Sequence, residues 1–162
     1  MNKKLYVIIV AATIFIIDQL SKSYAVSSLQ LYESVNIVPG FFNITLMHNR
    51  GIAFGLLSNL SENLRLALLV FVTFIVLIVV VYKLWDEYKD SLIAVSALGL
   101  IVGGALGNLY DRAFVGYVVD FIDIYVKQSH WPAFNIADSA ICVGVFLLVL
   151  NDFFFKKALV VS

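Results

Sequence analysis

The sequence predicts a helical membrane protein with four transmembrane helices. Of its 162 residues, 62% are hydrophobic and only 14% are charged, and the mean hydropathy is +0.96. Residues 66–82 and 91–110 contain no charged side chain, and each run approaches the roughly 20 residues that cross a bilayer. Such long uncharged runs are typical of transmembrane helices and not of soluble domains.

We expect the spans at about residues 5–26, 64–84, 91–110 and 134–155, within one membrane domain that covers residues 1–162. The first span also resembles a secretory signal peptide, because Lys3 and Lys4 precede an apolar run and Ala25 to Ser27 resembles a cleavage site. The polar stretch DQLSK interrupts that run, and three further spans follow it. We therefore interpret residues 5–26 as a retained first helix.

The placement of lysine and arginine gives the expected orientation. Six of these residues flank one side of the membrane and five the other, so the bias is weak. The first helix usually dominates, and Lys3 and Lys4 at its start favour a cytoplasmic location for both termini. The two long connections, residues 27–63 and 112–132, then lie on the extracytoplasmic side.

These two connections differ in pattern. Residues 27–63 contain the turn signal Pro39-Gly40 and the partly alternating stretch FFNITLMHN, which together predict a small β-rich segment. Residues 112–132 mix aromatic and charged side chains, and we expect a short interfacial helix or a loop there. Trp131 fits the aromatic belt at the membrane surface.

Polar residues on three of the spans fall at the same membrane level. With this topology, the outer ends of the first, third and fourth spans carry Asp18, Lys22, Asn108, Asp111, Arg112, Asn135 and Asp138. Asp18 and Lys22 are four residues apart, and Asn135 and Asp138 are three apart. Gly104, Asn108 and Arg112 step by four, so each of these sets lies on one helix face and can point into the bundle. Ionisable residues inside spans are costly and mark functional sites, which predicts a site at this level.

Asp120 and Asp138 are the leading candidates for chemistry. Two neighbouring carboxyl groups can share a proton, so that one acts as a base toward water and the other as an acid. The simpler alternative makes Asp120 a solvated loop residue and Asp138 a favourable charge at a helix start. Asp123 is a rival to Asp120, and spacing alone leaves that choice open.

Other protease chemistries fit the sequence less well. A serine–lysine pair needs a neutral lysine, but Asp18 lies one helical turn from Lys22 and favours its charged form. His48 and His130 belong to no HExxH pattern, so we expect neither a zinc site nor another metal cofactor. Cys142 is the only cysteine and, in the middle of the fourth span, we interpret it as a packing residue.

The motifs DQLSK, HNRGIAFG, GGALGNLYDR, VVDFID and FNIADSA occur in this order along nearly the whole chain. Together they resemble the motifs of bacterial lipoprotein signal peptidase, the signal peptidase II family. The resemblance implies four transmembrane helices, an extracytoplasmic β-cradle and a short extracytoplasmic helix. It also implies an aspartic endopeptidase of the cytoplasmic membrane that cleaves diacylglyceryl-modified prolipoproteins just before the lipidated cysteine. Globomycin and myxovirescin are the inhibitors that it implies.

The resemblance also assigns residues. It implies that Asp120 and Asp138 are the catalytic pair, and this favours Asp120 over Asp123. The motif positions that it implies as substrate-binding or supporting are Asp18, Lys22, Asn49, Gly104, Asn108, Arg112 and Asn135. Ile52 stands where the second motif commonly has a small residue, which concerns the packing of the cradle.

Two non-protease functions remain as alternatives. A small transporter could use Asp18 and Asp138 on a proton route, but the charged groups cluster at one membrane face instead of crossing it. A structural membrane subunit leaves the clustering unexplained. The formal net charge of zero gives no indication of a nucleic-acid partner, and we expect a monomer in contact with membrane lipid.

Overall fold

The computed structural model describes residues 2–51, 60–88 and 91–156 and contains four long helices. They are α1 (Lys3–Ser28), α2 (Glu62–Tyr88), α3 (Leu92–Tyr110) and α4 (Ile136–Asn151). All four are long and apolar enough to cross a membrane, which confirms the predicted transmembrane helices. Two π-helical turns, η1 (Asp111–Val115) and η2 (Asp152–Lys156), extend α3 and α4.

Polar side chains fix where three of the helices begin. The side chain of Asn2 accepts a hydrogen bond from the Lys4 backbone nitrogen at 2.9 Å at the start of α1. Ser91 caps α3 in the same way, and Asn135 caps α4. Such caps satisfy backbone N–H groups that have no partner inside the helix.

Helix α3 is the centre of the bundle and packs closely against α1 and α4. A Cβ atom on Gly103 would lie 2.6 Å from the backbone oxygen of Ala11 in α1. A Cβ atom on Gly104 would collide with the backbone oxygen of Ala137 in α4. Glycine at these two positions therefore allows three backbones to approach one another, as small residues do in membrane helix packing.

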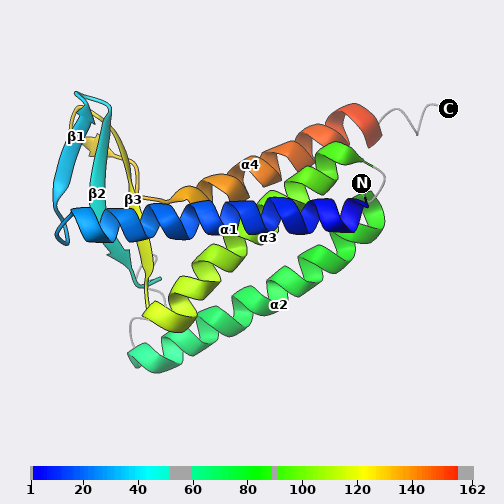
Figure 1. Cartoon of the computed structure of the whole chain (residues 1–162), viewed down its shortest axis with the longest axis horizontal. Helices are drawn as coiled ribbons and strands as arrows, with labels where there is room; N and C mark the ends of the chain where they lie inside the picture. The colour runs from blue at the N-terminus through cyan, green and yellow to red at the C-terminus, as the bar shows by residue number, and fades with distance from the viewer. Residues whose placement is uncertain (1, 52–59, 89–90, 157–162) are drawn as a thin grey trace.

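A four-stranded antiparallel sheet lies across one end of the bundle (Figure 1). Its strands, in sheet order, are β1 (Ser34–Val38), β2 (Phe42–Asn49), β3 (Val118–Val126) and β4 (Ser129–His130). The turn between β1 and β2 contains Gly40 with φ of 80°, a left-handed conformation that glycine adopts readily. The β-rich segment predicted before α2 is thus confirmed within the described residues; Ile52 lies outside them.

The prediction for residues 112–132 was only partly right. Residues Asp111–Val115 are helical, but the following stretch VVDFIDIYV forms β3 in the middle of the sheet. β3 pairs with β2 on one side, and Ile122 forms a bridge to Phe134 on the other. Its β-branched and aromatic residues suit a paired, half-buried strand better than an interfacial helix.

A small apolar core joins the sheet to the helices. Ala25 near the end of α1 packs with Leu46 of β2 and with Val119 and Phe121 of β3. α1 begins and α4 ends at the far end of the bundle from the sheet (Figure 1). The interpretation of Cys142 as a packing residue is wrong, because its side chain is exposed on the lateral surface of α4.

Candidate active site

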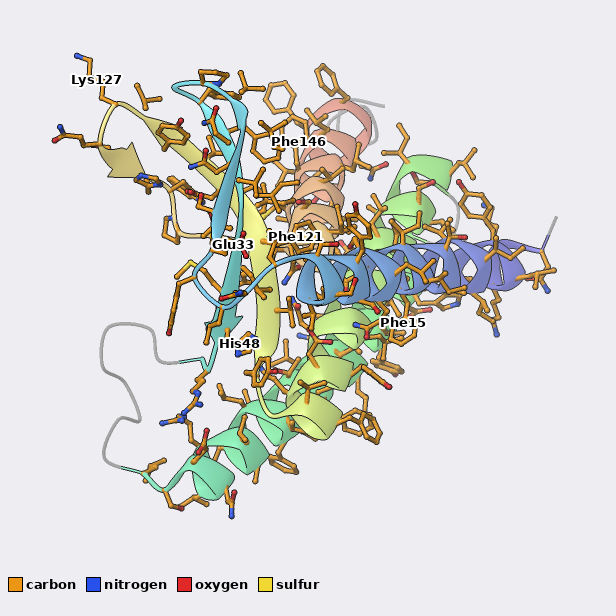
Figure 2. All side chains as sticks on the ribbon, turned by 60° about the vertical axis from the view of Figure 1, so that its left-hand side comes forward. Phe15, Glu33, His48, Phe121, Lys127 and Phe146 are labelled. Atoms are coloured by element: carbon orange, nitrogen blue, oxygen red, sulfur yellow. The ribbon has the colours of Figure 1, made fainter. Side chains whose placement is uncertain are left out.

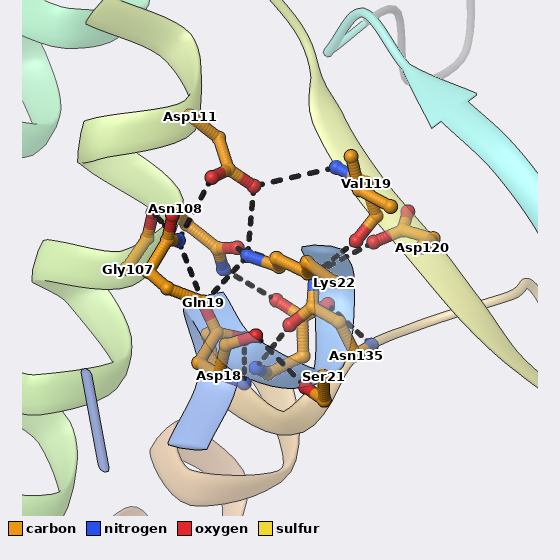
Figure 3. A network of polar contacts seen from close by, with 12 residues as sticks. Asp18, Gln19, Ser21, Lys22, Gly107, Asn108, Asp111, Val119, Asp120 and Asn135 are labelled. Atoms are coloured by element: carbon orange, nitrogen blue, oxygen red, sulfur yellow. Dashed lines mark hydrogen bonds and ion pairs between the residues drawn. The ribbon is translucent and has the colours of Figure 1, made fainter. Parts of the chain in front are cut away.

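A buried ion cluster lies where α1 meets α3, just below the sheet (Figure 3). The ammonium group of Lys22 is 2.8 Å from a carboxylate oxygen of Asp18 and 2.8 Å from one of Asp111. It also donates to the side-chain oxygen of Asn108 at 3.1 Å. All three charged side chains are buried. Because a buried charge is stable only when it is paired and hydrogen-bonded, this cluster fixes α1 against α3.

The same cluster reaches α4. The second oxygen of Asp18 accepts a hydrogen bond from the backbone nitrogen of Ala137 at 2.9 Å, in the first turn of α4. Gln19, which the sequence analysis did not single out, donates to Asp18 at 3.2 Å and to Asp111 at 2.9 Å. Its place inside DQLSK, beside Asp18, was the available signal. Asp18 and Lys22 therefore act as a structural link among three helices.

Asp120 lies on β3 with only 3% of its surface exposed. Its carboxylate accepts hydrogen bonds from the Asn135 amide at 2.7 Å and from the Asn49 amide at 3.0 Å. Burial raises the pKa of Asp120 to about 6; the Asn49 hydrogen bond opposes this rise, and the neighbouring charge of Asp138 adds to it. Asp120 is therefore a carboxyl group that gains or loses a proton near neutral pH.

Asp138 lies in the first turn of α4 and is half-buried. One of its oxygens accepts from the Asn108 amide at 2.8 Å, and the other from the backbone nitrogen of Asn135 at 3.3 Å. The side chain of Asn135 in turn accepts from the Asp138 backbone nitrogen at 2.9 Å, which completes a capping box. Two donors therefore hold the Asp138 carboxyl group at the start of α4.

The two aspartates are thus joined through asparagine side chains. Asn135 bonds to both of them, and it also donates to Asn108 at 3.2 Å. Asn108 connects Asp138 to Lys22, so the buried ion cluster and the carboxyl pair form one network. The structure brings Asp18, Lys22, Asn49, Asn108, Asn135, Asp120 and Asp138 together, as the sequence motifs predicted.

The other two predicted supporting residues have more indirect positions. Arg112 donates to the backbone oxygen of Asn108 at 3.3 Å, and its charge interacts electrostatically with Asp138 and Asp120. Gly104 contributes no polar group and acts through its close contact with Ala137, two residues from Asn135.

Asp123 lies outside this network, farther along β3. Its carboxylate is 2.7 Å from the His130 ring and accepts from Asn43 at 3.1 Å and from Thr45 at 3.2 Å. Burial works to raise the pKa of Asp123, but these hydrogen bonds outweigh it and lower the pKa below its usual value. Asp123 is therefore ionised at neutral pH and does not contact Asp138.

Asp120 opens into a groove of about 710 Å³ on the sheet. Its lining comes from the α1–β1 connection, β2, β3 and the segment before α4, and includes Leu31, Tyr32, Met47, His48, Asn49, Pro132 and Ala133. The groove mixes polar and apolar side chains, which suits an extended peptide. Within residues 2–51, 60–88 and 91–156, no group of three or more His, Cys, Asp or Glu side chains is arranged to hold a metal ion.

Fold and site together define a multi-pass membrane protein with two hydrogen-bonded aspartates, one of which lines a groove on the sheet. Residues 10–154 match the family model described as "Signal peptidase (SPase) II". The chain belongs to the signal peptidase II family. Its function is therefore that of an endopeptidase of the aspartic class, which cleaves signal peptides from prolipoproteins.

Individual relatives are similar in sequence to this chain over nearly its whole length. The lipoprotein signal peptidase of Geobacter metallireducens is 46% identical over 88% of this chain and 87% of its own length. That of Francisella tularensis subsp. novicida is 42% identical over 97% of each chain. A solved bacterial membrane enzyme, determined by the in meso method, has a TM-score of 0.76 and 35% identity and covers 93% of this chain and 91% of its own.

Proposed function

We propose that Asp120 and Asp138 are the catalytic pair of this enzyme. The observation that carries the proposal is the hydrogen-bond network in which Asn135 contacts both aspartates, one of which, Asp120, lines the groove. The charge of Asp138 also helps to raise the pKa of Asp120, so the two carboxyl groups interact electrostatically.

The surroundings of the two side chains suggest different roles. Asp138 lies at the start of α4, where the helix dipole favours an acidic side chain, and we assign it the role of the base that takes a proton from the attacking water. Asp120, whose pKa is raised to about 6, acts as the acid and gives its proton to the oxygen of the scissile carbonyl as the water attacks. When the tetrahedral intermediate collapses, Asp138 gives its proton to the leaving nitrogen, and Asp120 recovers its own.

The substrate proposal is a prolipoprotein whose cysteine carries a diacylglyceryl group, cut immediately before that cysteine. The groove lies at the end of the helix bundle, so the acyl chains can stay in the bilayer while the scissile bond reaches Asp120. We expect globomycin and myxovirescin to inhibit the enzyme by occupying this site.

The location follows from the same arrangement. We propose that the enzyme lies in the bacterial cytoplasmic membrane, with both termini in the cytoplasm and the sheet on the extracytoplasmic face. α1 begins and α4 ends at the end of the bundle opposite the sheet, which supports this topology. We further propose that the enzyme acts as a monomer, because the groove and both aspartates come from one chain.

The test is cleavage by the purified enzyme of one prolipoprotein in two forms, with and without the diacylglyceryl group. We expect the modified form to be cut before its modified cysteine and the unmodified form to be cut far more slowly. Equal rates for the two forms would contradict lipid recognition. If globomycin abolishes cleavage of both the modified and the unmodified form, both cleavage activities come from this site.

A further inference from the structure

A second hollow on the sheet adjoins the catalytic groove. It has a volume of about 470 Å³ and shares Met47, Pro132 and Ala133 with the groove as common walls. Its remaining lining is mostly polar and consists of Ser34, Asn43, Thr45, Asp123, His130 and Trp131. A chain lying in the groove can therefore continue directly into this hollow.

The path of β3 explains why the two hollows are neighbours. Asp120 and Asp123 are three residues apart, and strict alternation along a strand would turn them to opposite faces. The backbone nitrogens of Phe121 and Ile122 both donate to the oxygen of Phe134, at 3.1 Å and 2.8 Å. This is the pattern of a β-bulge, which re-aims side chains along the strand. Both aspartates consequently face hollows with shared walls.

The side chains of the second hollow are held in fixed positions. Asp123 uses one oxygen for His130 and the other for Asn43 and Thr45. The His130 ring also stacks on Tyr125, with ring centroids 4.9 Å apart. Because Asp123 contacts Nδ1, the other ring nitrogen of His130 is left for a ligand. Ser34 and Thr45 share a 2.8 Å hydrogen bond, and hydroxyl groups both donate and accept.

We propose that this hollow is a substrate subsite that binds a polar side chain of the mature lipoprotein, two or three residues after the lipidated cysteine. The proposal rests on the function proposed above and adds a specificity determinant to it. Asp120 and Asp123 are three residues apart on β3, so a substrate chain that runs along this strand needs about the same number of residues to pass from one to the other.

The direction of the chain follows from the polarity of the two substrate parts. The signal peptide is apolar and returns to the membrane, whereas the mature chain leads into water. The β3–β4 turn, marked by Lys127 in Figure 2, points away from the helix bundle, and His130 lies close to that turn in sequence. A polar hollow on this side therefore suits the mature chain.

The charges in the hollow define which side chain it accepts. His130 and the hydroxyl groups favour a neutral side chain that both donates and accepts hydrogen bonds, such as serine or asparagine. Asp123 disfavours a carboxylate in the substrate, because two negative charges within the same hollow repel each other. An alanine at the same substrate position gains neither contact.

The test uses lipid-modified prolipoproteins that differ only at the second or third residue after the lipidated cysteine, which is serine, asparagine, aspartate or alanine. We expect the enzyme to cleave the serine and asparagine substrates with a kcat/KM about three- to tenfold higher than the alanine substrate. In His130→Ala this preference should fall below about twofold, because the serine and asparagine substrates should lose more kcat/KM than the alanine substrate does. Asp123→Asn should reduce the difference in kcat/KM between the asparagine substrate and the aspartate substrate.

Lys127→Ala, on the exposed turn next to this hollow, is the matched control. It should leave the ratios of kcat/KM among the four substrates unchanged. Thr45→Val keeps the side-chain shape, and it should weaken the serine preference without altering cleavage of the alanine substrate. A uniform loss on all four substrates in His130→Ala, or a preference that survives it, would overturn the subsite. A failure of the proposed catalytic function would give a different result. Asp120→Asn would then cleave the alanine substrate as fast as the parent enzyme does.

Discussion

The side-chain amide of Asn135 lies 2.7 Å from the carboxylate of Asp120. Through its other atoms the same residue caps α4 and holds Asp138 in place. One side chain therefore sets the distance between an aspartate on a strand and an aspartate on a helix. Positioning of this kind is what allows two carboxyl groups to share a proton during a reaction.

Asn135→Ala removes both the hydrogen bond to Asp120 and the side-chain cap of α4. We expect kcat to fall about 100-fold or more and the free energy of unfolding to fall by about 1 kcal/mol. Asn135→Ser separates them, because serine is a good helix cap but is too short to hold Asp120. Its thermal stability in detergent should be close to that of the parent, while its kcat stays low. Recovery of kcat in Asn135→Ser would mean that capping alone matters.

The pH dependence of kcat/KM should report the raised pKa of Asp120. Because Asp120 acts in its protonated form, activity should fall as pH rises through about 6. The Asn49 hydrogen bond stabilises ionised Asp120, so Asn49→Leu should raise its pKa and move this alkaline limb to higher pH. A shift confined to the acidic limb would instead make Asp120 the base and Asp138 the acid.

Lys22→Met should be strongly destabilising, although Lys22 reaches Asp138 only through Asn108. It leaves Asp18 and Asp111 buried at close range without their cation, and breaking such a pair typically costs about 3 to 5 kcal/mol. Thermal denaturation in detergent measures the loss. Adding Asp111→Asn to Lys22→Met removes one of the two unpaired charges and should restore part of the stability; additive destabilisation would contradict the cluster.

Gly104→Ala should reduce activity by displacing α4. The added methyl group meets the backbone oxygen of Ala137, which cannot move without shifting Asp138 one residue away. We expect kcat to fall at least about tenfold while the protein still inserts and binds globomycin. Leu106→Ala, on the exposed face of the same helix, is the control and should retain activity.

Sequence reasoning could predict the helices because hydropathy and helical length are local properties. It could also place polar residues of three spans at one level, since topology alone decides which helix ends meet. β2 was visible from its alternation, whereas the two aspartates of β3 made that strand resemble an interfacial segment. The composition of VVDFIDIYV was the missed signal, because it is dominated by Val, Ile, Phe and Tyr.

The partners of individual polar residues were beyond local reasoning. Lys22 was expected to pair with Asp18, but its second carboxylate, Asp111, comes from a helix some ninety residues later in the sequence and depends on how closely α1 approaches α3. The choice between Asp120 and Asp123 likewise depends on the bulge opposite Phe134. Only the packed structure shows that Asp120 joins the asparagine network and that Asp123 turns to His130.

The most direct test of the catalytic pair is the turnover rate of well-folded Asp120→Asn and Asp138→Asn on a diacylglyceryl-modified prolipoprotein. Asp123→Asn, assayed on the same substrate, is the matched control. We expect each of the first two variants to lose at least about 1,000-fold in kcat, and the double variant to be little worse, because members of one catalytic unit are not additive. Asp123→Asn should stay within about tenfold of the parent enzyme. Near-normal turnover by Asp138→Asn would show that Asp138 is only a charge at the start of α4, and the proposed mechanism would be wrong.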